Sequence, residues 1–156
     1  MLAFCGIDYC SIDSNGRVKL SPRNLEDFTS KGSDIVLYCL PEGAVAVYPE
    51  ETYLKIRQER EIAGNRAASS FLGRQMLRQS GAWTQSQRIT AQGRITIPQA
   101  FREHAGIGSG SQKMVIVGVE IGVELWTVER WEAEKRRMQE HDNLKREREM
   151  QSDLNI

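Results

Sequence analysis

The 156-residue sequence has little that would place it in a membrane or direct it out of the cell. Its longest apolar run, MVIVGV at 114 to 119, is far too short to cross a bilayer. The amino terminus, MLAFCGIDYC, lacks a basic segment and carries Asp8 where a signal sequence needs an unbroken apolar stretch. We therefore expect a cytoplasmic protein without membrane contact.

Metal ligands are also scarce and poorly spaced. Cys5, Cys10 and Cys39 lack the paired CxxC spacing of a zinc site, and the only histidines, His104 and His141, lie far from them in sequence. We expect no metal and no cofactor, and we expect the cysteines to be small buried side chains in a reducing compartment.

No constellation of residues indicates catalysis. Glu103 and His104 could serve as an acid/base pair, but no nucleophile, phosphate-binding loop or metal set accompanies them. Both come just before Gly106, which is expected to end a helix, so His104 is better explained as a residue that interacts with the helix dipole. We expect neither an enzyme nor a small-molecule substrate.

Charge of one sign is not in excess, since Lys plus Arg equals Asp plus Glu at 21 each, which argues at first against a nucleic-acid partner. The distribution is uneven, however. Basic and acidic residues number four and eight in residues 1 to 53, nine and two in residues 54 to 102, and eight and eleven in residues 103 to 156. The middle third can therefore present a positive face. The alternative is that its arginines only solvate helix surfaces, namely Arg57, Arg60, Arg66, Arg74 and Arg78.

The sequence contains an internal duplication. GRVKL at 16 to 20 is matched by GRITI at 93 to 97, which lies 77 positions later. Residues 34 to 53 and 112 to 131 each read as two apolar strands around a glycine turn, then an aromatic residue, then the start of a helix. Two copies indicate a pair related by a pseudo-twofold axis, because a solenoid needs three or more repeats.

Each copy reads as a hairpin, a short linker or helix, two more strands and a helix. Asn15-Gly16 is typical of a type I′ turn, in which both residues need positive φ, and Asp13 can accept hydrogen bonds from the turn amides. Pro98 suits the first turn of a helix that ends at Gly106.

The segment between the copies and the carboxyl-terminal tail both have helical character. Residues 50 to 79 carry apolar residues at helical spacing, with breaks expected at Gly64 and Gly81. After Trp131 the chain is polar nearly all round, which predicts a solvated helix that frays at its final SDLNI. The apolar residues of the connector are Ala67, Ala68, Phe71, Leu72 and Met76.

Both Gly-Arg strands place apolar residues on one face and cationic or hydroxyl residues on the other, because side chains alternate along a strand. The outward set is Arg17, Lys19, Arg94 and Thr96. A major groove admits a two-stranded ribbon, and guanine O6 and N7 match an arginine fork. Lys19 and Thr96 would then reach phosphates or neighbouring base edges. We expect both arginines to be exposed, and either side chain sealed within the hydrophobic interior, or locked to a carboxylate of its own subunit, would refute this interpretation.

The motifs DSNGRVKL and TAQGRITIPQAFREHAGI, followed by YPEETY and WTVERW respectively, resemble the MraZ transcriptional regulators. That family carries two SpoVT-AbrB (swapped-hairpin) domains in tandem, and the resemblance covers about residues 1 to 132. It implies an α+β fold of duplicated AbrB-like β-barrel units with connecting and C-terminal helices. The expected parts are a first domain at 1–53, a helical connector at 54–82, a second domain at 83–131 and a charged tail at 132–156.

The resemblance also implies a function. A bacterial regulator of this family binds double-stranded DNA at repeated boxes upstream of cell-division and cell-wall genes, assembles into a homo-oligomeric ring and is associated with the nucleoid. Its principal DNA contact is the arginine of an Asp-x-x-Gly-Arg signature, which falls on Arg17 and Arg94. The turn-forming residues are then Asp13, Asn15, Gly16, Thr90 and Gly93.

Two departures from the family pattern affect these expectations. Thr90 stands where the second signature has its aspartate, so its hydroxyl would have to cap the turn. The proline of the first copy, Pro22, falls one position later than Pro98, which argues against a matching helix and against a role for Arg23.

Two other functions remain open at this stage. An AbrB-like antitoxin uses the same fold to bind DNA and a terminal segment to bind a toxin. The two motifs in this chain, and its mixed-charge tail in place of an apolar, acidic one, favour the regulator. A ring scaffold that does not bind DNA would use the arginines only to pair with carboxylates of neighbouring subunits.

Overall fold

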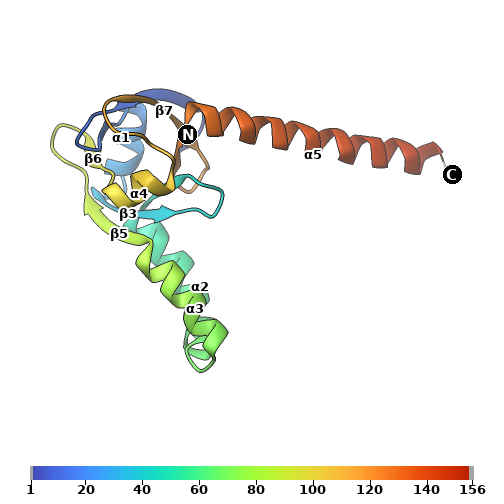
Figure 1. Ribbon diagram of the computed structural model, residues 1–156, viewed down its shortest axis with the longest axis horizontal. Coiled ribbons are helices and arrows are strands. Elements are labelled where there is room, and N and C mark those ends of the chain that lie inside the picture. The colour runs from blue at the N-terminus through green and yellow to red at the C-terminus, as the bar shows by residue number, and fades with distance from the viewer. Residues whose placement is uncertain (1, 155–156) are drawn as a thin grey trace.

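The computed structural model describes residues 2–154, except for the side chains of residues 59–64, where Arg60 lies. The elements in chain order are β1 (Ile7–Ile12), β2 (Arg17–Lys19), α1 (Pro22–Thr29), β3 (Asp34–Cys39), β4 (Val45–Pro49), α2 (Glu50–Ala67), α3 (Phe71–Ala82), β5 (Thr84–Arg88), β6 (Arg94–Thr96), α4 (Gln99–His104), β7 (Gln112–Gly118), β8 (Val123–Thr127) and α5 (Val128–Leu154). Figure 1 shows a small body from which two helical projections extend in different directions.

The duplication is visible in this order of elements. The series β1, β2, α1, β3, β4, α2 recurs as β5, β6, α4, β7, β8, α5, and α3 has no counterpart. Strands of both copies form one antiparallel eight-stranded sheet in the order β5-β3-β4-β8-β7-β1-β2-β6. The two copies therefore interleave instead of folding apart, and β2 of the first copy pairs with β6 of the second. The α+β class and the AbrB-like barrel architecture are confirmed.

One hydrophobic core fills the interior of the barrel-like sheet and contains side chains from both copies. Val18 and Ile95, which lie opposite each other on β2 and β6, are fully buried, and so are Leu37 and Met114. A second, smaller cluster lies under the start of α5, where Trp126 contacts Trp131 with ring centroids 5.8 Å apart. Burial of apolar surface contributes roughly 25 cal/mol per Å², so this shared core holds the two copies together.

The expectation that the first copy lacks a matching helix is wrong. Helix α1 begins at Pro22, and the Oγ of Ser21 caps it by accepting a hydrogen bond from Asn24 N at 3.3 Å. Asp8 on β1 completes this start, since its Oδ2 accepts from Ser21 Oγ, Arg23 Nη2 and Asn24 Nδ2 at 2.9 to 3.2 Å. Proline tolerates the first position of a helix, where its missing N–H is not needed, so the later proline does not prevent the helix.

The connector forms a helical hairpin, but its first break is not at Gly64. Helix α2 continues through that residue to Ala67, and α3 ends one residue beyond Gly81. A break falls instead at Ser70, which caps α3 by accepting a hydrogen bond from Gly73 N at 2.9 Å.

Helix α5 extends from the body as a single long rod (Figure 1). All its described residues from Lys135 onward are exposed, and the ion pairs Lys135–Glu132 and Arg137–Glu134 run along its surface. The expected fraying at SDLNI is not found as far as Leu154, and the last two residues lie outside the described part. Within the part of the chain that the structure describes, no helix is both long enough and apolar enough to cross a membrane.

Cysteine and histidine side chains serve the packing of the body. Cys39 is buried, whereas Cys5 and Cys10 are only half-buried, so the expectation of burial holds for one of the three. His104 ends α4, where its Nε2 donates to Leu40 O and its ring lies 5.8 Å from that of Trp83. Among residues 2–154, leaving aside the side chains of 59–64, no three His, Cys, Asp or Glu side chains form a group that could hold a metal ion.

Candidate nucleic-acid interface

The four outward residues of the Gly-Arg strands come together on one two-stranded ribbon. Strands β2 and β6 run antiparallel with Arg17 opposite Thr96 and Lys19 opposite Arg94. All four are exposed, while the central pair between them is buried beneath the ribbon. The ribbon therefore carries a compact surface of three cations and one hydroxyl, which we call the basic ribbon: Arg17, Lys19, Arg94 and Thr96.

The turn before β2 is organised by Asp13. Its Oδ1 accepts hydrogen bonds from Asn15 N and Arg17 N, both at 2.9 Å, and its backbone O accepts from Gly16 N at 3.0 Å. Gly16 has φ +83°, but Asn15 does not have a positive φ, so the expected type I′ turn is wrong. A three-residue loop with glycine in the left-handed position takes its place, because Asp13 draws the following amides toward its own carboxylate.

The turn before β6 has the same shape with different chemistry. Gly93 has φ +76°, and its N donates to Thr90 O at 2.9 Å. The Thr90 hydroxyl accepts from Arg94 N at 3.0 Å, so it takes the place of one carboxylate oxygen. It has no second oxygen with which to hold the Arg94 side chain.

The two turns lock each other in position. Ile97 N donates to Gly16 O at 2.7 Å, and Leu20 N donates to Gly93 O at 2.9 Å. Each glycine therefore supports the strand that leaves the other copy's turn, as a pseudo-twofold pair requires. This exchange places the two arginines on one ribbon although they lie 77 positions apart in the sequence.

Arg17 is not free of carboxylates, contrary to the expectation from sequence. Its Nε lies 2.8 Å from Asp13 Oδ2, and the two side chains remain 48% and 39% exposed. The pKa of Asp13 lies below the usual value for an aspartate, chiefly because its carboxylate accepts the backbone hydrogen bond of Arg17. Within the described residues, Nη1 and Nη2 of Arg17 make no hydrogen bond, and Arg94 forms no ion pair.

Apart from Arg102 on α4, the basic residues of the middle third divide between two places in the structure. Arg88 and Arg94 lie on β5 and β6, whereas the arginines of α2 and α3 lie on the projecting helical hairpin. The exposed members of the hairpin are Arg57, Arg66, Arg74 and Arg78. The positive face at the ribbon is therefore smaller than the count of charges in the sequence suggests.

Sequence reasoning missed Arg102, which supports the first turn from α4. Its Nη1 donates to Ser14 O at 3.4 Å, and its guanidinium lies over Gly16. Leu25 occupies the matching place in the other copy, against Gly93. The 77-residue offset relates Leu25 to Arg102 and is the signal that could have located this contact.

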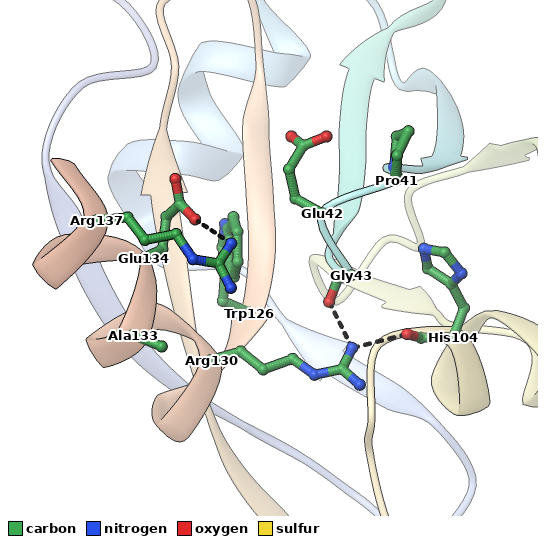
Figure 2. A pocket seen from close by; sticks show the side chains of 9 residues that line it. All are labelled: Pro41, Glu42, Gly43, His104, Trp126, Arg130, Ala133, Glu134 and Arg137. Carbon is green, nitrogen blue, oxygen red and sulfur yellow. Dashed lines mark hydrogen bonds and ion pairs between the residues drawn. The ribbon is translucent and has the colours of Figure 1, made fainter. Parts of the chain in front are cut away.

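A hollow of about 380 Å³ beside the start of α5 does not form part of the basic ribbon (Figure 2). Arg130 reaches across it, and its Nη1 donates to Gly43 O and to His104 O, both at 2.8 Å. Burial raises the pKa of Glu124 beside it, and this effect is opposed by the hydrogen bond from Trp126 and reinforced by nearby Glu42 and Glu134. Arg130 therefore links α5 to loops of both copies across the hollow, and its guanidinium is already engaged by two backbone carbonyls.

Comparison with known proteins identifies the family. Residues 82–154 match the family model described as "MraZ protein, putative antitoxin-like", so the match includes α5 to its described end. A protein named transcriptional regulator MraZ from Lachnoclostridium phytofermentans is 34% identical over 123 residues, which span 78% of this chain and 79% of that protein. A protein of the same name from Bifidobacterium longum is 34% identical over 125 residues, which span 78% of this chain and 75% of that protein. One from Corynebacterium urealyticum is 28% identical over 134 residues, or 83% and 84%. Transcriptional regulators are not a class of enzyme, and this chain belongs to the MraZ family of transcriptional regulators.

Proposed function

We propose that the protein regulates transcription by inserting the basic ribbon into the major groove of double-stranded DNA. The observation that carries this proposal is the β2–β6 pairing, which gathers Arg17, Lys19, Arg94 and Thr96 on one exposed surface. The major groove accepts a two-stranded ribbon, and its guanines offer O6 and N7 to an arginine fork. The proposed targets are repeated boxes upstream of cell-division and cell-wall genes, bound by a cytoplasmic, nucleoid-associated protein.

The ion pair between Arg17 and Asp13 is compatible with this role. It engages Nε alone, so the two terminal nitrogens stay available for a bidentate contact to a guanine. The pair is exposed, and exposed ion pairs are weak and screened by salt. Because Asp13 holds Nε at 2.8 Å, it orients the guanidinium before binding, which reduces the conformational entropy that binding would otherwise remove.

The two arginines are held differently, which supports a division of roles. Arg17 is anchored at Nε and suits the reading of a base edge, whereas Arg94 has only its backbone fixed by Thr90. An unanchored arginine adapts readily to a phosphate.

One ribbon neutralises few phosphates, so a single subunit binds weakly. In a ring of subunits, later contacts become intramolecular and gain from a high effective concentration. Exposed apolar side chains on the helical hairpin support such an assembly, because contiguous exposed apolar surface often marks an interface. They are Leu54, Phe71, Leu72, Met76 and Leu77, with exposures of 41% to 75%.

Fluorescence anisotropy on the duplex directly upstream of the protein's own coding sequence tests the proposal. Arg17→Ala is expected to weaken binding by about 10-fold or more, since a good bidentate base contact contributes roughly 1–3 kcal/mol. Arg94→Ala should weaken binding by a similar factor, since a hydrogen bond to a charged phosphate contributes about 1.5–3 kcal/mol. Arg148→Ala, which removes an exposed cation from α5, is the matched control and should change binding less than twofold. Wild-type affinity in both ribbon variants would refute the proposal.

The number of boxes provides a second test. Affinity should rise steeply from a duplex with one box to a duplex with three, because the ring converts added boxes into intramolecular contacts. Equal affinity for both duplexes would contradict ring-based binding. Light scattering of the same samples reports the oligomeric state independently.

An antitoxin function is the second candidate, favoured by the matching family model, which is described as "MraZ protein, putative antitoxin-like". The exposed arm of α5 from Lys135 to Leu154 would then be the segment that binds a partner, although its mixed charge argues for the regulator. Such an arm would bind a toxin while the ribbon binds DNA. Co-purification of a small nuclease with the full chain, lost on truncation after residue 134, would favour this candidate over a regulator that acts alone.

A further inference from the structure

The hairpin of the second copy is closed differently from that of the first. In the first copy β1 and β2 pair through their backbones, with Ile12 opposite Val18. In the second copy β5 and β6 lie at opposite ends of the sheet order and have no backbone pairing among the described strands. The edge of β6 that faces away from β2 therefore needs other partners for its peptide groups.

The side chain of Gln87 on β5 supplies those partners at Thr96. Its Nε2 donates to Thr96 O at 2.8 Å, and its Oε1 accepts from Thr96 N at 2.7 Å. A primary amide has the same donor and acceptor as a peptide group, so Gln87 takes the place of one rung of an antiparallel ladder. One side chain thus closes the barrel along the free edge of the basic ribbon.

We propose that Gln87 is a positioning residue for DNA binding, which holds β6 and its DNA-contacting side chains in the geometry that the groove requires. This inference rests on the proposed function of the basic ribbon. Thr96 is opposite Arg17 on β2 and two residues from Arg94 on β6. A shift at Thr96 would therefore displace both strands of the basic ribbon.

The second copy depends on Gln87 because its other anchors are weaker. Arg94 lacks the carboxylate that fixes Arg17, so its placement follows from the backbone of β6 alone. The residue that matches Gln87 in the first copy, 77 positions earlier, is Cys10, whose thiol cannot both donate to and accept from one peptide group as a primary amide does. In the first copy, β2 is held by its backbone pairing with β1.

Gln87→Met removes both hydrogen bonds to Thr96, and a longer one from Gln87 Nε2 to Gln85 Oε1 at 3.4 Å, at nearly constant side-chain size. We expect it to weaken binding to the upstream duplex about 10-fold, through the loss of two hydrogen bonds that order the ribbon. Gln139→Met is the control, because it makes the same change at an exposed position on α5, far from β6 and from the Gln87 amide. It should bind within twofold of wild type.

Amide hydrogen exchange separates positioning from general loss of stability. In the wild type, the Thr96 amide should be protected although β6 is an edge strand, and Gln87→Met should remove that protection while Val18 and Ile95 remain protected. In an Arg17→Ala, Arg94→Ala background, Gln87→Met should cause less than a twofold further loss of binding, because its effect acts through those side chains. If Gln87→Met does not fold, Gln87→Asn is used, since its amide is one methylene too short to reach both groups.

The outcomes distinguish this inference from the proposed function. Wild-type affinity of the Gln87 variant, an unprotected Thr96 amide in the wild type, or a 10-fold further loss in the double-arginine background would each overturn the role of Gln87. The first two results leave the proposed function intact if the arginine variants themselves bind weakly. If the arginine variants bind like wild type, the proposed function fails and the role of Gln87 fails with it.

Discussion

Gly16→Ala tests the interlocked turns on which the basic ribbon is built. Gly16 has φ +83°, and a Cβ at this position would lie 2.6 Å from the backbone O of Ile97. That carbonyl belongs to the strand whose amide donates to Gly16 O at 2.7 Å. The substitution therefore meets backbone as well as the movable guanidinium of Arg102 at 3.1 Å, and the turns must move apart to accept it.

The expected destabilisation has two parts. A left-handed backbone disfavours an alanine by roughly 1–2 kcal/mol. Weakening the hydrogen bond from Ile97 N adds about 0.5–1.5 kcal/mol. The free energy of unfolding should then fall by about 2–3 kcal/mol, and the melting temperature by about 4–12 °C for a chain of this length.

Differential scanning calorimetry measures this effect, and two other glycines calibrate it. Gly32→Ala is the matched control, because Gly32 also has a positive φ, +96°, but a Cβ there meets nothing within 4 Å. Gly93→Ala should be intermediate, since its Cβ would lie 2.9 Å from the movable Cδ2 of Leu25. If Gly16→Ala is no more destabilising than Gly32→Ala, the proposed interlock of the turns is refuted.

Three further predictions follow from the site and its supports. Asp13→Asn should lower the melting temperature at neutral pH. The difference from wild type should shrink once the pH falls below the usual pKa of an aspartate and disappear below the lowered pKa of Asp13. The stabilisation by the ionised carboxylate is fully present above the unfolded-state pKa and is lost as the pH falls through the folded-state pKa; a difference that grows in acid would contradict this sign. Asp8→Ala should reduce the free energy of unfolding by about 1–3 kcal/mol in urea titrations, because the buried Asn24 side chain loses its partner, and an unchanged midpoint would show that the start of α1 does not depend on Asp8. Arg94→Ala should reduce the slope of log K against log salt by about 0.9 if Arg94 binds one phosphate, whereas an unchanged slope with relaxed sequence preference would assign it to a base.

The facing of the Gly-Arg strands could be predicted because it depends on local alternation alone. Val18 and Ile95 point inward and Arg17 and Arg94 outward, as the two-residue period of a strand requires. The duplication also predicted the order of elements, because each copy repeats the same sequence of turns and apolar runs. These features need no knowledge of distant contacts.

The errors arose where side-chain hydrogen bonds, most of them from other elements, decide the local structure. Helix α1 forms although Pro22 falls one position later than Pro98 does in the second copy, because Asp8 on β1 accepts hydrogen bonds from residues at the start of the helix. Asn15-Gly16 favours a type I′ turn, but the carboxylate of Asp13 stabilises a different loop and also binds Arg17. Gln87 gave no signal, since a glutamine on a polar edge strand is usually a solvated residue. The contacts of Asp8 and Gln87 form only in the assembled barrel, whereas those of Asp13 lie within one turn, and the error there concerned the type of turn.

Arginine-specific modification with phenylglyoxal, read by mass spectrometry with and without the upstream duplex, tests the role of the basic ribbon most directly. Arg17 and Arg94 should react in the free protein and become protected on the duplex, whereas Arg74 on α3 and Arg148 on α5 should react at the same rate in both samples. A scrambled duplex should protect less at equal concentration. Protection of Arg74 or Arg148 by DNA, with Arg17 and Arg94 unchanged, would contradict the placement of DNA on the ribbon.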